Sequence, residues 1–465
     1  MKNVQDSMVE GVTASGERIE ARLVRLGRFD AVLELSGAFH QLRTSQKLTA
    51  LKITSGPRGL YEGPATVRHL VNTHDGLVCE VALDETGLNL EMLPQPETAG
   101  YEDFARIWLA SNQITPAFKA AVTDMEVYCD NLRAWMNQLE VVLRADGPQR
   151  AAENEKAFLN RIAPRVVAAV NALHERFEEL AGAIRPEDRG AHQNHVWRVW
   201  GPYYLGTPFG HRTRHKPLGY AGDYEMMNMI MRKTFEGRSL YEKVMHYWLV
   251  SQWPAESVRN RIVHLQENLV GEVARVARTG RRARILNIGC GPAWEAQEFL
   301  KATALSSEAD FTLLDFNEET LAYVRNRLGE LICQHGRRAT VAVQQSTVQQ
   351  MMRSALQGKA VEPGQKYDFI YCAGLFDYLS DTTCKALVNL FFQWLHPGGL
   401  VLVANMNDSR PFRHMVEFLL DWHLIYRNSR FMASLCPHHP EAVCCVITEA
   451  TTVNLFTHVR HVPAG

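Results

Sequence analysis

The stretch from residue 283 to residue 300, A-R-I-L-N-I-G-C-G-P-A-W-E-A-Q-E-F-L, constrains the fold of this chain more than any other. It begins with a short apolar run at 285–288, which is typical of a buried parallel strand. The run breaks at G-C-G-P (289–292) and continues with helix-forming residues at 294–300. Glycine lets a ligand approach the backbone closely, and the helix N-terminus that follows offers unpaired N–H groups. The stretch therefore predicts the first strand, turn and helix of a nucleotide-binding α/β domain.

The glycine pattern is G-x-G-P rather than the dinucleotide-binding G-x-G-x-x-G, because Trp294 stands three positions after Gly291. A tight turn between a strand and a helix is the alternative interpretation of such a glycine pair. The pattern resembles motif I of the class I S-adenosylmethionine (SAM) methyltransferases. That resemblance implies a domain at 281–465 with SAM as its cofactor.

An acidic residue ends the next predicted strand, at 311–315, and lies 24 residues beyond Gly291. At the end of a second strand, the carboxylate of Asp315 can accept hydrogen bonds from both ribose hydroxyls. The strand predicted at 339–343 is followed by the place where this class contacts adenine, although the usual acidic residue is absent there. By resemblance, we expect cofactor contacts at Asn287, Gly289, Cys290, Gly291, Pro292, Asp315, Phe316, Ser346, Thr347, Cys372, Ala373 and Gly374.

Later segments match the same class in order. Residues 367–378, Y-D-F-I-Y-C-A-G-L-F-D-Y, are predicted to be strand four with its exit loop, the motif IV position. The turn L-x-P-G-G-x-L at 395–401 leads into strand five, and 443–449 with 453–459 supply a closing antiparallel pair. The resemblance covers about 280–460 and implies an α/β fold, the seven-stranded Rossmann-like class I methyltransferase domain.

The N-terminal part, 1–97, is expected to form a small antiparallel β-barrel. Short strand-like runs between about 18 and 91 are separated by glycine and proline turns, a spacing typical of such barrels. The part loosely resembles a PilZ domain, whose ligand is cyclic di-GMP, and Arg18 with Arg22 supply an R-x-x-x-R. The second PilZ motif is missing at 34–37, so a docking or structural barrel is the default expectation.

Residues 98–190 are predicted to be helical. Apolar residues recur at spacings of three and four over 118–143 and again over 159–180. This pattern indicates two long amphipathic helices of a small bundle. Their apolar stripes are most simply a core, and the alternative is a homodimer interface or a base for a substrate lid.

Residues 191–280 are predicted to carry a lid over cofactor and substrate, because aromatic residues are dense there. The segment 216–225, K-P-L-G-Y-A-G-D-Y-E, contains two glycines around which an ordered loop can bend. We expect Tyr220, Asp223 and Tyr224 to face the cofactor. In the alternative interpretation, Asp223 only caps the helix that starts near Tyr224.

An insertion at 412–427 is expected to border the methyl acceptor. If it is helical, a histidine and an arginine share one face with an apolar stripe, above the strand ends where ligands bind in this architecture. A cation or an N–H donor would hold a carboxylate acceptor, whereas a hydroxyl or amine needs a base. The catalytic candidates are His423, Arg427 and Asp377, with Trp422 and Tyr426 on the substrate side.

Four segments together resemble a bacterial set of methyltransferases labelled as making methyl esters of 3-hydroxy fatty acids, which are quorum-sensing signals. They are K-P-L-G-Y-A-G-D-Y-E-M-M-N (216–228), L-N-I-G-C-G-P-A (286–293), A-G-L-F-D-Y-L (373–379) and D-W-H-L-I-Y-R (421–427). This resemblance implies methyl transfer to an oxygen of a lipid-like carboxylic acid. The alternatives are an N- or O-methyltransferase on another small metabolite or peptide, and a SAM-binding regulatory protein without catalysis.

Composition limits the partners. A formal net charge of −1 makes no case for a nucleic-acid partner. No apolar run reaches the roughly 18 residues that a membrane span needs, and no secretory signal is visible at the start. The nine cysteines follow no metal-binding pattern. We therefore expect a cytoplasmic protein with reduced thiols, no metal and a small-molecule acceptor.

Overall fold

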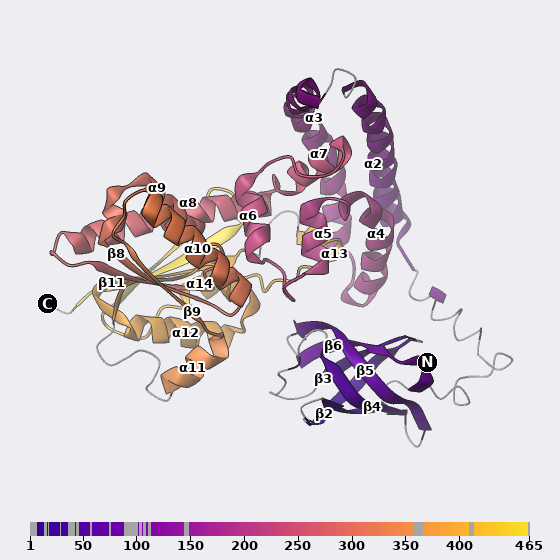
Figure 1. Cartoon of the computed structure of the whole chain (residues 1–465), viewed down its shortest axis with the longest axis horizontal. Helices are drawn as coiled ribbons and strands as arrows, with labels where there is room; N and C mark the ends of the chain where they lie inside the picture. Colours follow the sequence, from indigo (N-terminus) through magenta and orange to yellow (C-terminus); the bar gives the residue numbers. More distant parts are fainter. Residues whose placement is uncertain are drawn as a thin grey trace. The chain divides into compact units, whose positions relative to one another are not determined.

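The computed structural model falls into two compact units (Figure 1). Residues 1–113 with 217–220 form the first unit, and residues 114–216 with 221–465 form the second. The structure describes residues 7–87 with gaps at 14–15, 17, 28, 36–41, 43–45, 56–57 and 74–75, then 101, 105, 108–109, 113–143, 148–356, 366–408 and 413–463.

The first unit contains a closed antiparallel barrel with the strand order β1-β2-β3-β6-β5-β4. Alternate residues of a strand point to opposite faces, and in β3 the inward residues Ala31, Leu33 and Leu35 are fully buried. The predicted small barrel is therefore confirmed. Its elements are β1 (Ser7–Thr13), β2 (Arg18–Leu26), β3 (Asp30–Leu35), β4 (Lys47–Ser55), β5 (Arg58–Thr73), β6 (Gly76–Leu83) and the 3-10 helix η1 (Glu85–Gly87).

The resemblance to PilZ domains rests on strand β2. Arg18 begins this strand, and Arg22 forms an ion pair with Glu34 of β3 at 3.0 Å. Residues 36–37 of the incomplete second motif lie outside the described residues. The resemblance therefore stays a prediction.

The second unit begins with a run of helices. Helix α2 buries Phe118, Val122, Met125 and Cys129 at spacings of three and four, so its apolar stripe faces a core. The two long helices predicted within 98–190 are α2 and α3, and α3 continues through Pro164. The helices are α2 (Pro116–Leu143), α3 (Pro148–Gly182), η3 (Pro186–Asp188), α4 (Arg189–Tyr204), α5 (Pro208–His215), α6 (Tyr224–Arg232), α7 (Leu240–Leu249) and α8 (Trp253–Ala277).

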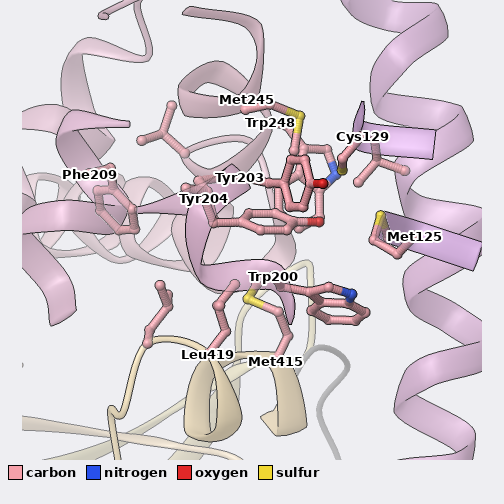
Figure 2. Close-up of a cluster of buried hydrophobic side chains, with 14 of the residues drawn as sticks. Met125, Cys129, Trp200, Tyr203, Tyr204, Phe209, Met245, Trp248, Met415 and Leu419 are labelled. Carbon is pink, nitrogen blue, oxygen red and sulfur yellow. The ribbon is translucent and has the colours of Figure 1, made fainter. Parts of the chain in front are cut away.

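An aromatic core joins these helices (Figure 2). Trp200 and Tyr204 of α4 lie beside Trp248 of α7, and the Tyr204 and Trp248 ring centroids are 5.6 Å apart. Met415 and Leu419, which come from the insertion after strand β11, enter the same core. Several of the aromatic side chains that suggested a lid therefore have a packing role.

The rest of the second unit is built on a seven-stranded sheet with the order β12-β13-β11-β10-β7-β8-β9. Strands β11, β10, β7, β8 and β9 are parallel, whereas β13 pairs antiparallel with both β11 and β12. The predicted mixed sheet with its closing antiparallel pair is confirmed. Its strands are β7 (Ala283–Ile288), β8 (Ala309–Asp315), β9 (Thr340–Gln345), β10 (Tyr367–Cys372), β11 (Leu395–Met406), β12 (Ala442–Thr448) and β13 (Asn454–His461).

Helices cover both faces of this sheet, with one apolar core on each face (Figure 1). Helices α8, α9 and α10 contribute to one core, and α11, α12 and α14 contribute to the other. Strand β10 is buried at all its positions, as a central parallel strand should be. The elements not yet given are α9 (Trp294–Ala302), η4 (Ala304–Glu308), α10 (Glu318–Gln334), α11 (Val348–Leu356), η5 (Phe376–Tyr378), α12 (Asp381–Gln393), α13 (Arg413–Phe418) and α14 (Ser429–Ala433).

The insertion predicted as one helix at 412–427 is helical only in part. Helix α13 ends at Phe418, and Asp421 has a left-handed backbone with φ +52°. An α-helix cannot continue through that conformation. The expectation that His423 and Arg427 share a helix face is therefore wrong.

The cysteines and the apolar segments give two further findings. Cys436 and Cys444 form a disulfide, which corrects the expectation that all cysteines are reduced thiols. The bond joins the chain just after α14 to strand β12. In the described part of the chain, no helix is long and apolar enough to cross a membrane.

Candidate active site

The candidate site lies where the strand order of the sheet reverses. Strand β7 is central, the chain proceeds from it to β8 and β9 on one side, and it returns to β10 and β11 on the other. In open α/β sheets, ligands bind outside the carboxyl ends of the strands at such a switch point. The residues that follow β7, β8, β9 and β10 are therefore the ones that can meet a shared ligand.

The glycine turn after β7 is held open by the neighbouring strand. The backbone N–H groups of Gly289 and Cys290 both donate to the carbonyl of Leu314, at 2.8 Å and 2.9 Å. Gly289 and Gly291 have positive φ values of +67° and +51°, which glycine adopts without strain. A Cβ placed on Gly291 would have no described heavy atom within 4 Å, so the backbone there borders open space. This geometry fits a ligand that lies against the turn.

Asp315 ends β8 directly beside this turn. Its carboxylate accepts hydrogen bonds from the backbone N–H of Gly291 at 3.1 Å and of Asn317 at 3.0 Å. Burial raises the pKa of Asp315, and these backbone hydrogen bonds oppose the rise. Since a carboxylate offers about four acceptor sites, Asp315 can accept further hydrogen bonds from a ligand. The structure thus brings Asp315 and Gly291 together, as expected.

The residues proposed for the adenine side adjoin Asp315. The backbone N–H of Ser346 donates to the carbonyl of Asp315 at 2.9 Å, and Thr347 accepts at its Oγ1 from the N–H of Gln350 as α11 begins. Phe316 is 45% exposed, which is high for a phenylalanine that follows a buried strand. The strand ends of β8 and β9 therefore present an aromatic face and two hydroxyls.

A buried polar network stands behind the glycine turn. Asn287 donates to Glu295 Oε1 at 3.0 Å, and the Tyr371 hydroxyl donates to the same oxygen at 2.9 Å. Burial raises the pKa of Glu295, while the hydrogen bond from Tyr371 and the charge of Arg261 lower it. The network ties β7, α9 and β10 together. Asn287 is a candidate from the sequence. Glu295 and Tyr371 are not, although both lie within the motif segments 283–300 and 367–378.

The exit of β10 is tightly packed. Cys372 is fully buried and burial raises its pKa, so the thiol stays protonated. Asp377, in η5, is 4% exposed, and its Oδ1 accepts from the backbone N–H of Met406. Burial raises the pKa of Asp377 to about 6, against the lowering effects of that hydrogen bond and of Arg261. Asp377 thus combines a high pKa with little exposure.

Helix α6 from the predicted lid lies against α9 and α10. The Tyr224 hydroxyl donates to Glu319 at 2.8 Å, and Trp294 Nε1 donates to Asn228 Oδ1 at 2.8 Å. Because Trp294 begins α9 directly after the glycine turn, α6 is anchored next to that turn. The expected position of Tyr224 is consistent with this anchoring.

Asp223 is fully buried and adopts the cap geometry. Its Oδ1 accepts from the backbone N–H groups of Glu225 and Met226, and its carboxylate accepts from Arg212 Nε at 2.8 Å. These contacts match the helix-cap alternative. Tyr220 belongs to the segment grouped with the first unit, so its place over the cofactor stays a prediction.

The insertion, the lid loop and the exit of β10 meet at Trp422. Trp422 Nε1 donates to the Tyr378 hydroxyl at 2.8 Å, and this hydroxyl donates to the carbonyl of Ala221 at 3.4 Å. A Cβ on Gly222 would lie 3.1 Å from the Trp422 ring and 3.2 Å from the Tyr378 hydroxyl, so a side chain there would crowd both. Three segments that were predicted separately are therefore neighbours.

A cluster of charges extends from this meeting point. Asp421 accepts from Lys216 Nζ at 3.0 Å and lies 3.3 Å from Arg214 and 3.2 Å from His423 Nε2. Burial alone would raise the pKa of Asp421, but hydrogen bonds from His423 and Lys216 hold it at about 2. His423 is largely exposed, so its role at the acceptor stays a prediction. Tyr426 packs under the guanidinium of Arg413, 4.4 Å from the ring centroid.

Arg427 has a different environment from His423. It is 4% exposed, and its guanidinium donates to Asp381, to Asn405 and to the carbonyls of Phe376 and Leu379. These partners join the exit of β10, the start of α12 and β11. The guanidinium therefore ties the fold together around the strand ends, and its expected contact with an acceptor stays untested.

Comparisons with known proteins find a family model and solved structures that are similar to parts of this chain. The model of a family described as a methyltransferase domain matches residues 262–459. No curated protein matches the chain. A solved structure of a possible exported protein from Bordetella parapertussis is similar at 15% identity, over 69% of this chain and 100% of that chain, with a TM-score of 0.43. N-methyltransferase NodS from Bradyrhizobium japonicum WM9, in complex with S-adenosyl-L-homocysteine, is similar at 14% identity, over 42% of this chain and 87% of that chain, with a TM-score of 0.28. Magnesium protoporphyrin IX methyltransferase (ChlM) from Synechocystis PCC 6803, with bound S-adenosyl-L-homocysteine, is similar at 8% identity, over 54% of this chain and 99% of that chain, with a TM-score of 0.33.

Proposed function

We propose that this SAM-dependent methyltransferase transfers a methyl group to a carboxylate oxygen of a small, lipid-like acid. The match of a methyltransferase-domain model to residues 262–459 supports this activity, with SAM as the cofactor. SAM, when bound, supplies an electrophilic methyl group on a sulfonium centre. The protein itself must bind and orient the two substrates and exclude water from between them.

On the donor side, the residues present fit the cofactor. The backbone at Gly289 and Gly291 borders space in which a ligand can lie against the turn. Asp315 retains acceptor sites for two ribose hydroxyls, and Ser346 with Thr347 adjoins it on the side proposed for adenine. The open turn beside a carboxylate of this kind is what a polar, nucleoside-containing cofactor requires.

The charge cluster at Asp421 is the observation that carries the acceptor proposal. Arg214 and Lys216 share this one carboxylate, so two permanent cations are balanced by a single anion. The excess positive charge stands next to Trp422, which contacts Tyr378 at the exit of β10. A carboxylate acceptor would be attracted to this place because opposite charges favour each other in a partly buried setting.

A carboxylate acceptor also removes the need for a base, because it is already ionised near neutral pH. A hydroxyl acceptor is the competing hypothesis, and the raised pKa of Asp377, about 6, is the observation that favours it. However, Asp377 is nearly inaccessible and one of its oxygens is bound to the Met406 N–H. We therefore favour the acid.

The lipid-like nature of the acid rests on sequence alone. The four segments between 216 and 427 resemble those of the methyltransferases labelled as making 3-hydroxy fatty acid methyl esters. A 3-hydroxy fatty acid carries both a carboxylate and a hydroxyl, so it tests the two acceptor hypotheses in one molecule.

The deciding experiment is to incubate the protein with SAM and a 3-hydroxy fatty acid, and to identify the product by mass spectrometry. Methyl ester formation supports the proposal, whereas a methyl ether or an N-methylated amine from a parallel panel contradicts it. Lys216→Gln should raise the KM for the acid several-fold and leave SAM affinity unchanged. Arg176→Gln, which removes an exposed pair with Asp124 on the long helices, is the matched control.

A further inference from the structure

Arg261 is a cation near the strand ends that belongs to none of the sequence motifs described above. It projects from α8 toward the exit of β10, where a Cβ placed on Gly374 would lie 3.8 Å from Arg261 Nη2. Helix α8 carries other arginines, and these are used by the fold. Arg259 donates to the carbonyls of Ile230 and Val250 and to Glu256, and Arg275 donates to Glu272.

The guanidinium of Arg261, in contrast, makes no hydrogen bond or ion pair with the residues that the structure describes. It is only partly buried. Burial lowers its pKa, and the charges of Asp377 and Glu295 oppose this without reaching hydrogen-bond distance. A guanidinium carries five N–H donors, and the described residues accept from none of those of Arg261. Arg261 can therefore bind an acceptor that the chain itself does not supply.

The surroundings of Arg261 identify the kind of acceptor. Glu295 lies in the first turn of α9, directly after the glycine turn, whereas Cys372 ends β10 and Gly374 follows it. Arg261 is thus set between the ends of β7 and β10, on the same side of the site as the glycine turn. Arginine binds carboxylates strongly because two of its N–H groups match the two carboxylate oxygens.

We propose that Arg261 binds the α-carboxylate of the amino-acid end of SAM. This inference rests on the donor site described above, in which that end lies at the glycine turn. Asp377 and Glu295 face the same guanidinium and keep the region from becoming strongly positive, which suits a zwitterionic amino acid that also carries an ammonium group. The acceptor acid is the other possible source of a carboxylate, but Arg214 and Lys216 already supply cations on the lid side.

The test compares two ligands that differ only in the carboxylate. S-Adenosyl-L-homocysteine and its decarboxylated analogue are titrated into the full-length protein by calorimetry, without any acceptor. In the wild type, the decarboxylated ligand should bind more weakly. Arg261→Gln should weaken S-adenosyl-L-homocysteine binding by about 10- to 100-fold, the range for a hydrogen bond to a charged group, and should change binding of the analogue less than about twofold.

The controls separate this role from a structural one. Arg278→Gln, at the exposed end of the same helix, should leave both affinities unchanged. Arg261→Lys keeps the charge but not the two-pronged geometry and should retain part of the preference for the carboxylate. An equal loss for both ligands in Arg261→Gln overturns the inference, as does unchanged binding with a raised KM for the acid. Because binding is measured without an acceptor, this test of Arg261 does not depend on whether the acceptor is a carboxylic acid.

Discussion

The carboxylate of Asp315 uses only part of its hydrogen-bond acceptor capacity within the chain. Two of its acceptor sites bind the N–H groups of Gly291 and Asn317, and the others are available to ribose hydroxyls. Asp315→Ala should weaken SAM binding by roughly 1.5–3 kcal/mol, the range for a hydrogen bond to a charged group. Asp310→Ala is the matched control, since Asp310 lies near the start of the same strand and pairs with Arg282 instead. Calorimetry that finds equal SAM affinity in wild type and Asp315→Ala would remove the assignment.

Asp377 gives a prediction about pH. Its pKa is about 6 in the folded chain against an ordinary value of 3.8, because burial disfavours the charged form. Between these values the folded state holds a proton that the unfolded state has released, so the free energy of unfolding falls as pH rises from about 4 to about 6. A shift of that size corresponds to on the order of 3 kcal/mol.

The isosteric variant Asp377→Asn cannot ionise and still accepts from the Met406 N–H, so its stability should not show this fall. The advantage of the variant over the wild type should grow between pH 4 and pH 6 and then stay constant. Urea unfolding followed by tryptophan fluorescence measures the free energy of unfolding of both proteins. All nine tryptophans lie between 108 and 422 and can report on it. Parallel pH curves for the two proteins would show that Asp377 ionises normally in the fold.

At the scale of elements, α6 is fixed to helices α9 and α10 by a few polar contacts. Asn228 accepts from Trp294 Nε1 and from the Tyr323 hydroxyl, and Tyr224 donates to Glu319. If α6 is a lid, Asn228→Ala should loosen it and speed SAM dissociation several-fold. Hydrogen exchange over 224–232 and stopped-flow dissociation measure the two effects.

The comparison for this lid variant is Asn131→Ala, since Asn131 is exposed on α2 and its amide donates to the carbonyl of Val127 on the same helix. It should change neither hydrogen exchange over 224–232 nor SAM dissociation. Faster exchange in Asn228→Ala with an unchanged dissociation rate would mean that α6 only braces α9. In that case the cap geometry of Asp223 would be the whole function of the loop before it.

The elements also show what a sequence can and cannot predict. The parallel strands were predictable because a buried strand between a glycine turn and a helix leaves a local pattern. The insertion was not, because its apolar residues Val416 and Leu419 pack into the distant core of α2, α4 and α7, and Asp421 then breaks the helix. Lys216 stabilises that break by donating to the carbonyl of Asp421, a contact across 205 residues that no local pattern reveals.

The same reasoning covers the site residues. Gly291 and Asp315 belong to short motifs at fixed spacing, and the structure brings them together as expected. Arg427 and Arg261 are single arginines without a motif, so their roles depend on which strand ends surround them. Arg427 is saturated by two side chains and two backbone carbonyls, and Arg261 has no hydrogen-bond partner among the described residues. Only the assembled sheet distinguishes these two cases.

At the scale of the whole molecule, the barrel and the methyltransferase domain belong to separate units. Every residue assigned to the donor, from Arg261 to Gly374, and every member of the Asp421 cluster lies in the second unit. A shortened chain of residues 98–465 should therefore bind SAM within about twofold of the full chain, since none of the groups that hold the donor is removed. Calorimetry measures the affinity, and tryptophan fluorescence checks that the second unit is folded.

A shortened chain that is folded but no longer binds SAM would contradict this division. It would also favour the remaining hypothesis, a regulatory protein in which the barrel and the SAM site act together. Retained binding with retained ester formation would instead leave the barrel a role in docking, separate from the chemistry.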